Sequence, residues 1–83
     1  MNMSVMPIAK NGSCPSGYHS EGSACMPNAS AKPAIPKNGS CPSCWHSEGN
    51  YCVANSATPK NVIPKNGSCP SGYHSEGNYC VQN

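Results

Sequence analysis

The sequence predicts a small disulfide-rich protein, mostly irregular with short β-hairpins, in which three tandem cysteine-stapled repeats form an elongated chain with no sizeable core. The first observation is the cysteine content, seven in 83 residues, which is typical of small crosslinked scaffolds. The second is a poor apolar inventory, with no Phe, no Leu and a single Trp. The third is a phrase, KNGSCPSGYHSEG, that occurs twice unchanged and once as KNGSCPSCWHSEG. A chain with so little to bury needs disulfides, a metal or a partner to hold its shape.

The first cysteine of each copy is followed eleven positions later by another cysteine. The copies start 27 and 28 residues apart, a period that usually corresponds to one small structural unit per copy. The segments between copies are rich in Pro, Ala, Ser and Asn, which favour extended backbone over helix. We therefore divide the chain into an N-terminal tail (1–9), three repeats (10–28, 37–55 and 65–83) and two linkers (29–36 and 56–64).

Turn residues predict a small hairpin in each repeat. Asn-Gly is the strongest short signal for a type I′ turn, and Ser-Glu-Gly closes a second turn with its Gly left-handed. In the third copy, this second turn is expected to place Tyr73 near Tyr79 and Gly72 near Cys80. Cys-Pro-Ser-Gly fits a type I turn that folds Cys69 back toward Cys80. We therefore expect one disulfide per repeat, pairing Cys14 with Cys25, Cys41 with Cys52 and Cys69 with Cys80.

The middle copy departs from the pattern because Cys44 and Trp45 replace the Gly and Tyr of the other copies. With seven cysteines, one thiol of this copy stays unpaired within the chain. A redox Cys-x-x-Cys dithiol lacks its usual βαβ context here, and haem attachment requires His where Trp45 stands. Two interpretations remain. Cys44 is a free or intermolecular thiol that links this chain to another molecule, or it is a tolerated spare cysteine in a drifted copy.

Cysteine and histidine recur together in every copy, so metal binding is an alternative. Only the middle copy offers four ligands, and their spacing does not match a zinc-knuckle pattern. The expectation is therefore that no metal or other cofactor binds, and that the three histidines are exposed residues beside turns. The alternative set, for zinc or for copper(I) on reduced thiols, consists of Cys41, Cys44, His46 and Cys52.

The composition argues against several classes of function. We expect no catalytic residue, because the chain has no Asp, its three Glu occupy one turn position, and a Cys–His nucleophile would need a pocket that this chain cannot bury. A net charge of +2, with single lysines and no Arg, argues against nucleic acid. No apolar run approaches the roughly 20 residues of a membrane span. The cysteines favour an oxidising compartment, extracellular or periplasm-like, although the first residues show no signal peptide.

The segment Cys-Pro-Ser-Gly-Tyr, followed by a later Gly and Cys, resembles the Cys-Pro-x-Gly segments of cysteine-rich extracellular repeats in receptor-like and surface proteins. The similarity covers one short segment in each copy. Those repeats carry additional cysteines that copies one and three lack, so no function is transferred from them.

The predicted function is that of a non-catalytic structural or interaction protein, either an accessory subunit lying on a larger complex or a self-assembling surface or extracellular component. A protein partner or identical copies of the chain would support a structure that has little core of its own. The alternative is a ribosomal peptide precursor modified at its repeated cysteine motifs, or a thiol-based zinc or copper protein. Because Tyr and Trp add large contact area at low entropic cost, the predicted partner contacts are Tyr18, Trp45, Tyr51, Tyr73 and Tyr79.

Overall fold

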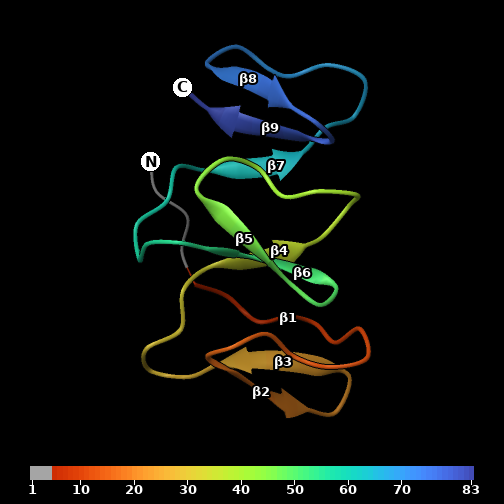
Figure 1. Cartoon of the computed structure of the whole chain (residues 1–83), viewed down its shortest axis with the longest axis vertical. Helices are drawn as coiled ribbons and strands as arrows, with labels where there is room; N and C mark the ends of the chain where they lie inside the picture. The colour runs from red at the N-terminus through yellow and green to blue at the C-terminus, as the bar shows by residue number, and fades with distance from the viewer. Residues whose placement is uncertain (1–4) are drawn as a thin grey trace.

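The structure, a computed structural model, describes residues 5–83, which form nine short strands and no helix. The strands make three separate antiparallel sheets of three strands each, one per repeat (Figure 1). This confirms the predicted class of tandem repeats with short β-hairpins. Residues 1–4 of the predicted N-terminal tail lie outside the described residues. In chain order the strands are β1 (Ile8–Ala9), β2 (Tyr18–Glu21), β3 (Ala24–Pro27), β4 (Ala34–Pro36), β5 (Trp45–Glu48), β6 (Tyr51–Ala54), β7 (Val62–Pro64), β8 (Tyr73–Glu76) and β9 (Tyr79–Gln82).

Each sheet has the same topology, in which the last strand of the repeat is central. The sheet orders are β1-β3-β2, β4-β6-β5 and β7-β9-β8. The short strand before each disulfide loop therefore pairs with the second strand of the hairpin that follows it. The ends of the two predicted linkers therefore belong to sheets, as β4 and β7. Their Val and Ile side chains suit a pleated strand. An edge position also tolerates the proline that ends each of these strands, because its missing N–H is not needed there.

The hairpin turn begins one residue later than predicted. In repeat 3, Glu76 pairs with Tyr79 and Tyr73 pairs with Gln82, so the predicted placement of Tyr73 near Tyr79 is wrong. Gly77, with a φ of +58°, takes the first central position of a two-residue loop rather than the second. A positive φ at that position alone is the geometry of a type II′ turn, whose twist matches that of the flanking strands.

Two further turns also differ from their predictions. Asn-Gly does not connect hairpin strands: Gly12 has a φ of +84°, but Asn11 is not left-handed and forms an isolated bridge with Ser13. A type I′ turn is therefore wrong here, because it needs a positive φ at both central residues. The next turn begins at Pro15 rather than at the cysteine, since the Tyr18 N–H donates to the Pro15 carbonyl at 3.1 Å. Its third residue is a left-handed Gly, so the turn is type II instead of type I.

The three predicted disulfides are present, and each joins the loop ahead of a hairpin to the central strand. The Cα atoms are 5.6, 5.6 and 5.5 Å apart in repeats 1, 2 and 3, the usual separation for a disulfide. The cysteine on each central strand is at most 1% exposed, so the disulfide is the innermost part of its repeat. The pairs are Cys14–Cys25, Cys41–Cys52 and Cys69–Cys80.

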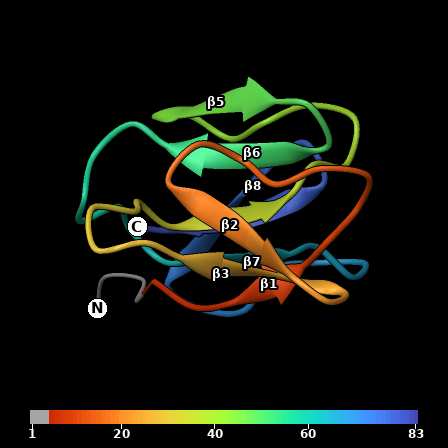
Figure 2. The same ribbon diagram turned by 90° about the horizontal axis from the view of Figure 1, so that it is seen from below.

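The three repeats stack in sequence order along the long axis of a molecule that measures 36 × 22 × 17 Å (Figure 1). Viewed along this axis, the sheets overlap while their strands run in different directions (Figure 2). Two small clusters of buried side chains lie where successive repeats meet, and no larger core is present among residues 5–83. The buried members are Tyr18, Cys25, Ala34, Tyr51 and Val53 in one cluster, and Trp45, Cys52, Ala54, Val62, Tyr79 and Val81 in the other.

Candidate functional site at the contacts between repeats

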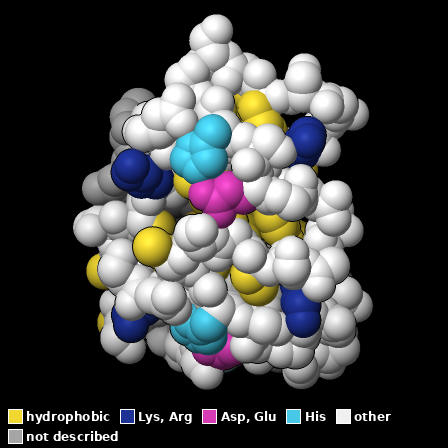
Figure 3. All heavy atoms as spheres, turned by 45° about the horizontal axis from the view of Figure 1, so that its top comes forward, with side chains coloured by type: hydrophobic (Ala, Val, Ile, Leu, Met, Phe, Trp, Pro, Cys, Tyr) yellow, Lys and Arg dark blue, Asp and Glu magenta, His cyan; other side chains and the backbone are white. Residues whose placement is uncertain are grey.

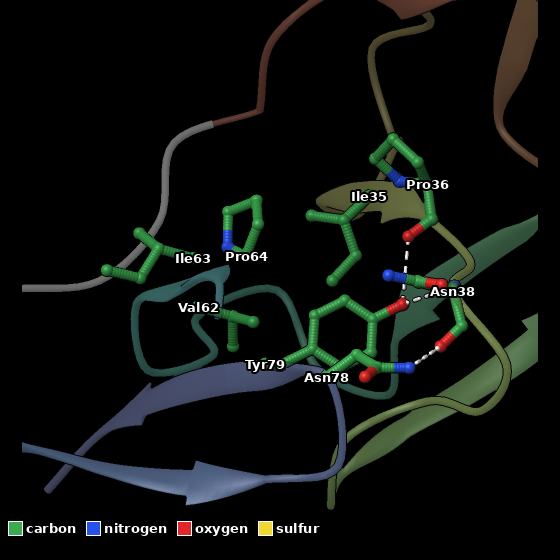
Figure 4. A pocket seen from close by; sticks show the side chains of 8 residues that line it. All are labelled: Ile35, Pro36, Asn38, Val62, Ile63, Pro64, Asn78 and Tyr79. Carbon is green, nitrogen blue, oxygen red and sulfur yellow. Dashed lines mark hydrogen bonds between the residues drawn. The ribbon is translucent and has the colours of Figure 1, made fainter. Parts of the chain in front are cut away.

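Each contact between repeats centres on a tyrosine that begins the central strand of the later repeat. Tyr51 and Tyr79 are 2% and 4% exposed, and each hydroxyl lies 3.8 Å from a disulfide sulfur of the preceding repeat. The Tyr79 hydroxyl accepts a hydrogen bond from the Asn38 N–H at 2.7 Å and donates one to the Pro36 carbonyl at 2.9 Å (Figure 4). Tyr51 makes the same pair of bonds to the equivalent backbone groups of repeat 1. One hydroxyl thus satisfies a donor and an acceptor of the neighbouring repeat.

The asparagine before each of these tyrosines contacts the same loop. Asn78 Nδ2 donates to the Asn38 carbonyl at 2.9 Å, and Asn50 Nδ2 donates to the Asn11 carbonyl at 3.0 Å. The amide passes close over the Gly of the Asn-Gly pair, because a Cβ built on Gly39 would lie 3.4 Å from Asn78 Nδ2. The Gly therefore allows both the left-handed backbone conformation at this position and the close approach of the Asn side chain from the next repeat.

A glutamate ties the hairpin of each later repeat to the type II turn of the earlier one. Glu48 Oε1 accepts a hydrogen bond from the Ser16 N–H, and Glu76 Oε1 accepts one from the Ser43 N–H, both at 2.8 Å. These backbone bonds lower the pKa of both carboxyls, because the charged form is the better acceptor. Among residues 5–83 no repeat lies before Glu21, and its side chain is 60% exposed, against 26% and 24% for Glu48 and Glu76.

The second oxygen of each glutamate meets a histidine of the same hairpin. The histidine Nε2 lies 2.6, 2.6 and 2.7 Å from this oxygen in the three repeats, and Nδ1 lies within hydrogen-bond distance of an asparagine Oδ1. Since both ring nitrogens face acceptors, the protonated ring satisfies both, and these hydrogen bonds raise the pKa of each histidine. Figure 3 shows two of these histidines (cyan), each beside a glutamate (magenta). The groups are His19–Glu21–Asn28, His46–Glu48–Asn55 and His74–Glu76–Asn83.

A cavity of about 200 Å³ opens beside Tyr79, between the edge strands β4 and β7 (Figure 4). Its walls are mainly aliphatic and proline side chains. The side chains of Tyr79 and Asn78, which also line it, already bond to repeat 2. The cavity therefore offers a mainly apolar surface. The remaining lining residues are Ile35, Pro36, Asn38, Val62, Ile63 and Pro64.

Cys44 is exposed and occupies the third position of the type II turn, where the other repeats have Gly. Its φ is +69°, which makes it the one left-handed residue other than Gly within residues 5–83. A left-handed conformation costs an L-residue on the order of 1–2 kcal/mol. The thiol borders a hollow of about 320 Å³ between repeats 2 and 3, with Lys60 and His74 among the other lining residues. Folding alone therefore gives no reason for a cysteine at this position.

The five aromatic residues predicted as partner contacts lie mostly inside the molecule. Tyr18 and Trp45 are each 8% exposed, Tyr51 and Tyr79 are more deeply buried, and Tyr73 is half-buried. Burial raises the pKa of the Tyr18 hydroxyl, which donates to a backbone carbonyl at 2.8 Å. Four of the rings pack where two repeats meet, and their contact with a separate partner stays a prediction.

The alternative metal ligands are not brought together, because Cys41 and Cys52 are bonded to each other. In the part of the chain that the structure describes, no group of three or more His, Cys, Asp or Glu side chains is placed to hold a metal ion. No helix long and apolar enough to cross a membrane occurs in residues 5–83.

Comparison of the chain with protein-family models, with curated proteins and with solved structures finds no match. Sequence reasoning missed the turn asparagine and glutamate as contacts between repeats. The available signal was a difference between copies: Ser23-Ala24 stand where repeats 2 and 3 have Asn-Tyr. Only the repeats that follow another repeat carry the Asn-Tyr pair.

Proposed function

We propose that this chain is a non-catalytic structural protein, a short stack of disulfide-closed hairpins that serves as an interaction component of a larger assembly. The observation that carries the proposal is that the side chains of the repeated motif form the bonds that hold the stack together. Its cysteines close the hairpins, and its Asn, Tyr and Glu side chains hold successive repeats together. Units in series extend a surface that a single unit cannot provide.

The surroundings of the polar side chains support a non-catalytic role. Each histidine is engaged with a glutamate and an asparagine on an open surface, and the cavity beside Tyr79 is apolar. A nucleophile and a base converging on an enclosed site, as catalysis requires, are not found among the described residues. The precursor and thiol-metal alternatives need free thiols, whereas six of the seven cysteines are paired.

Cys44 supplies the covalent link in this proposal. It is exposed, unpaired within the chain and held in a conformation that Gly adopts more easily. Costly backbone conformations that persist often serve function rather than folding. Attack of the Cys44 thiolate on a disulfide of another protein would break that disulfide, release one partner thiol and leave a mixed disulfide that attaches the stack through its middle repeat.

The test is the state of Cys44 in chain recovered, without reductant, from cells that make it naturally. We expect a disulfide-linked adduct of protein mass at Cys44, with the three disulfides within the repeats intact. Cys44→Gly should abolish the adduct. The matched control is Cys44→Gly with Gly72→Cys, which moves the thiol to the same turn position of repeat 3. An unmodified thiol at Cys44, or equal linkage through the moved thiol, would contradict the attachment.

A further inference from the structure

The contacts between repeats have a direction. In both of them, hydrogen-bonding side chains from the hairpin of the later repeat, which we call its inserting face, bond backbone groups beside a disulfide of the earlier repeat, which we call its receiving face. The inserting face consists of Glu48, Asn50 and Tyr51 in repeat 2, and of Glu76, Asn78 and Tyr79 in repeat 3. The receiving face of repeat 2 consists of the Pro36 carbonyl, the Asn38 N–H and carbonyl, the Ser43 N–H and the Cys41–Cys52 disulfide. Such a stack has two unlike ends.

The repeat 1 end cannot insert into another repeat. It keeps Glu21, but Ser23 and Ala24 replace the Asn and Tyr of the inserting face. Ala24 has no hydroxyl with which to bond the backbone of a further repeat, and its methyl group cannot fill the space of a tyrosine ring. Repeat 1 therefore closes the stack at its end.

The repeat 3 end carries a complete receiving face. Residues 64–71 have the same sequence, PKNGSCPS, as residues 36–43, which receive Tyr79. The backbone matches as well, because Gly67 has a φ of +85° where Gly39 has +84°. The Cys69–Cys80 disulfide spans 5.5 Å between Cα atoms, against 5.6 Å in repeat 2. The groups that hold a tyrosine in repeat 2 are thus present again in repeat 3.

This receiving face is open. Pro15 and Pro42 are buried beneath the following repeat, whereas Pro70 at the same position is exposed. A Cβ on Gly67 would meet nothing within 4 Å, whereas one on Gly39 would meet the amide of the next repeat. In Figure 3, where this end of the stack is tilted forward, backbone and polar atoms (white) surround small apolar patches (yellow). No described part of the chain takes the place that a further hairpin would fill.

We propose that the receiving face of repeat 3 is a docking site for a Glu-Gly-Asn-Tyr hairpin of a second polypeptide that contains this repeat. The occupant follows from continuity with two interfaces of the chain that already use this hairpin. Its tyrosine hydroxyl donates to the Pro64 carbonyl and accepts from the Asn66 N–H, and its glutamate accepts from the Ser71 N–H. The inference rests on the proposed interaction function and names the chemistry of one partner.

A second copy of this chain does not meet the requirement. Its repeat 1 offers Ala24 instead of tyrosine, and its Tyr51 and Tyr79 are buried in its own stack. The partner must therefore differ from this chain in its first repeat. Head-to-tail growth of identical copies is blocked by the same difference.

The test supplies the missing hairpin on the chain itself. The donor probe is the full chain with S23N and A24Y, which complete the inserting face of repeat 1, and with S71P, which disables its own receiving face. Pro is favoured at the second position of a type II turn, so S71P removes an N–H while keeping the turn. C44G is added to donor and receiver alike to exclude linkage through the thiol. The molar mass of an equimolar mixture with the C44G receiver is measured by light scattering and sedimentation.

A complex of one donor and one receiver is expected, while each protein alone is monomeric. Introducing S71P into the receiver should weaken binding by about tenfold or more, because a backbone bond to a carboxylate is lost. Three results would overturn the proposal: no complex between partners that are folded with the correct disulfides, a complex unchanged by S71P in the receiver, or self-association of the C44G chain alone.

A second probe covers the case of a donor that does not fold. Residues 56–83 are appended once more after Asn83, which gives repeat 3 a neighbour in the same chain. Hydrogen exchange of the Asn66 amide should slow by about tenfold or more, and replacing the appended tyrosine by Ala should restore the original rate. An unchanged Asn66 amide overturns the proposal. A protein adduct at Cys44 without docking would leave the proposed function standing and remove only this inference.

Discussion

Removal of one hydroxyl, Tyr79→Phe, tests whether the tyrosine holds successive repeats together. The hydroxyl accepts a hydrogen bond from the Asn38 N–H at 2.7 Å and donates one to the Pro36 carbonyl at 2.9 Å, and the residue is 4% exposed. Phe keeps the ring but leaves both backbone groups without a partner in the interface. Each such group costs about 1–3 kcal/mol when buried. Because both groups are only partly buried, we take the lower end for each, about 2 kcal/mol in total.

The measurement is urea-induced unfolding with the disulfides intact. A loss of about 2 kcal/mol is a substantial part of the roughly 4–12 kcal/mol that stabilises a domain of this length. It corresponds to a fall of about 8–16 °C in the thermal midpoint. The Asn38 amide gives a local measure of the same event, since its hydrogen exchange should become faster in the variant.

Tyr73→Phe is the matched control. The Tyr73 hydroxyl accepts a hydrogen bond from Asn61 Nδ2, in the linker before repeat 3, at 2.9 Å and bonds no residue of repeat 1 or 2 in the described part of the chain. Its removal should cost about 1 kcal/mol or less and should leave the Asn38 amide unchanged. Equal losses in the two variants, or an Asn38 amide that does not respond to Tyr79→Phe, would refute the reasoning.

Three further predictions concern the turn, the charges and the disulfides. Cys44→Gly should raise the free energy of unfolding by about 1 kcal/mol, because Gly adopts a φ of +69° without the cost to an L side chain. The check is the thermal midpoint of Cys44→Gly compared with that of Ser43→Gly, a control that should not be stabilised. The pKa values of the three histidines are raised, so the histidines stabilise the fold fully below pH 6.5, and this stabilisation is lost as the pH rises through their folded-state pKa values. The pKa values of Glu48 and Glu76 are lowered, so these carboxylates stabilise the fold above pH 4.5, and this stabilisation is lost as the pH falls through their folded-state pKa values. Urea unfolding from about pH 3 to about pH 9 should therefore show greatest stability between these limits, and a flat profile would contradict the hydrogen-bond network. Replacing Cys14 and Cys25 together by Ser should cost about 3 kcal/mol, since their disulfide closes a loop with a sequence separation of 11; a loss no larger than that of Cys44→Ser in calorimetry would count against the stapled hairpin.

The sequence by itself determined the disulfide of each repeat and the left-handed Gly of two of its turns, but not the turn types or the hairpin register. The disulfide pairing follows from cysteines only 11 positions apart, and the left-handed Gly residues follow from turns of four residues. Such features depend on short loops and on the backbone freedom of single residues, and both can be read from a few neighbouring residues. The left-over thiol at Cys44 is likewise a matter of counting. The elongated form and the small core were also predictable, since the chain has few apolar residues to bury.

Only the tertiary structure decided how the repeats use their motif. The pairing of β4 and β7 with the central strands turns the ends of the linkers into sheet, and the hairpin register depends on which Gly position the turn selects. Tyr79 is committed to Asn38, 41 residues earlier, and Glu76 to Ser43, 33 residues earlier. No local pattern distinguishes an inward tyrosine that bonds the preceding repeat from an outward one that bonds a partner. The choice is made when two units meet, because only then are backbone groups buried that a tyrosine hydroxyl must satisfy.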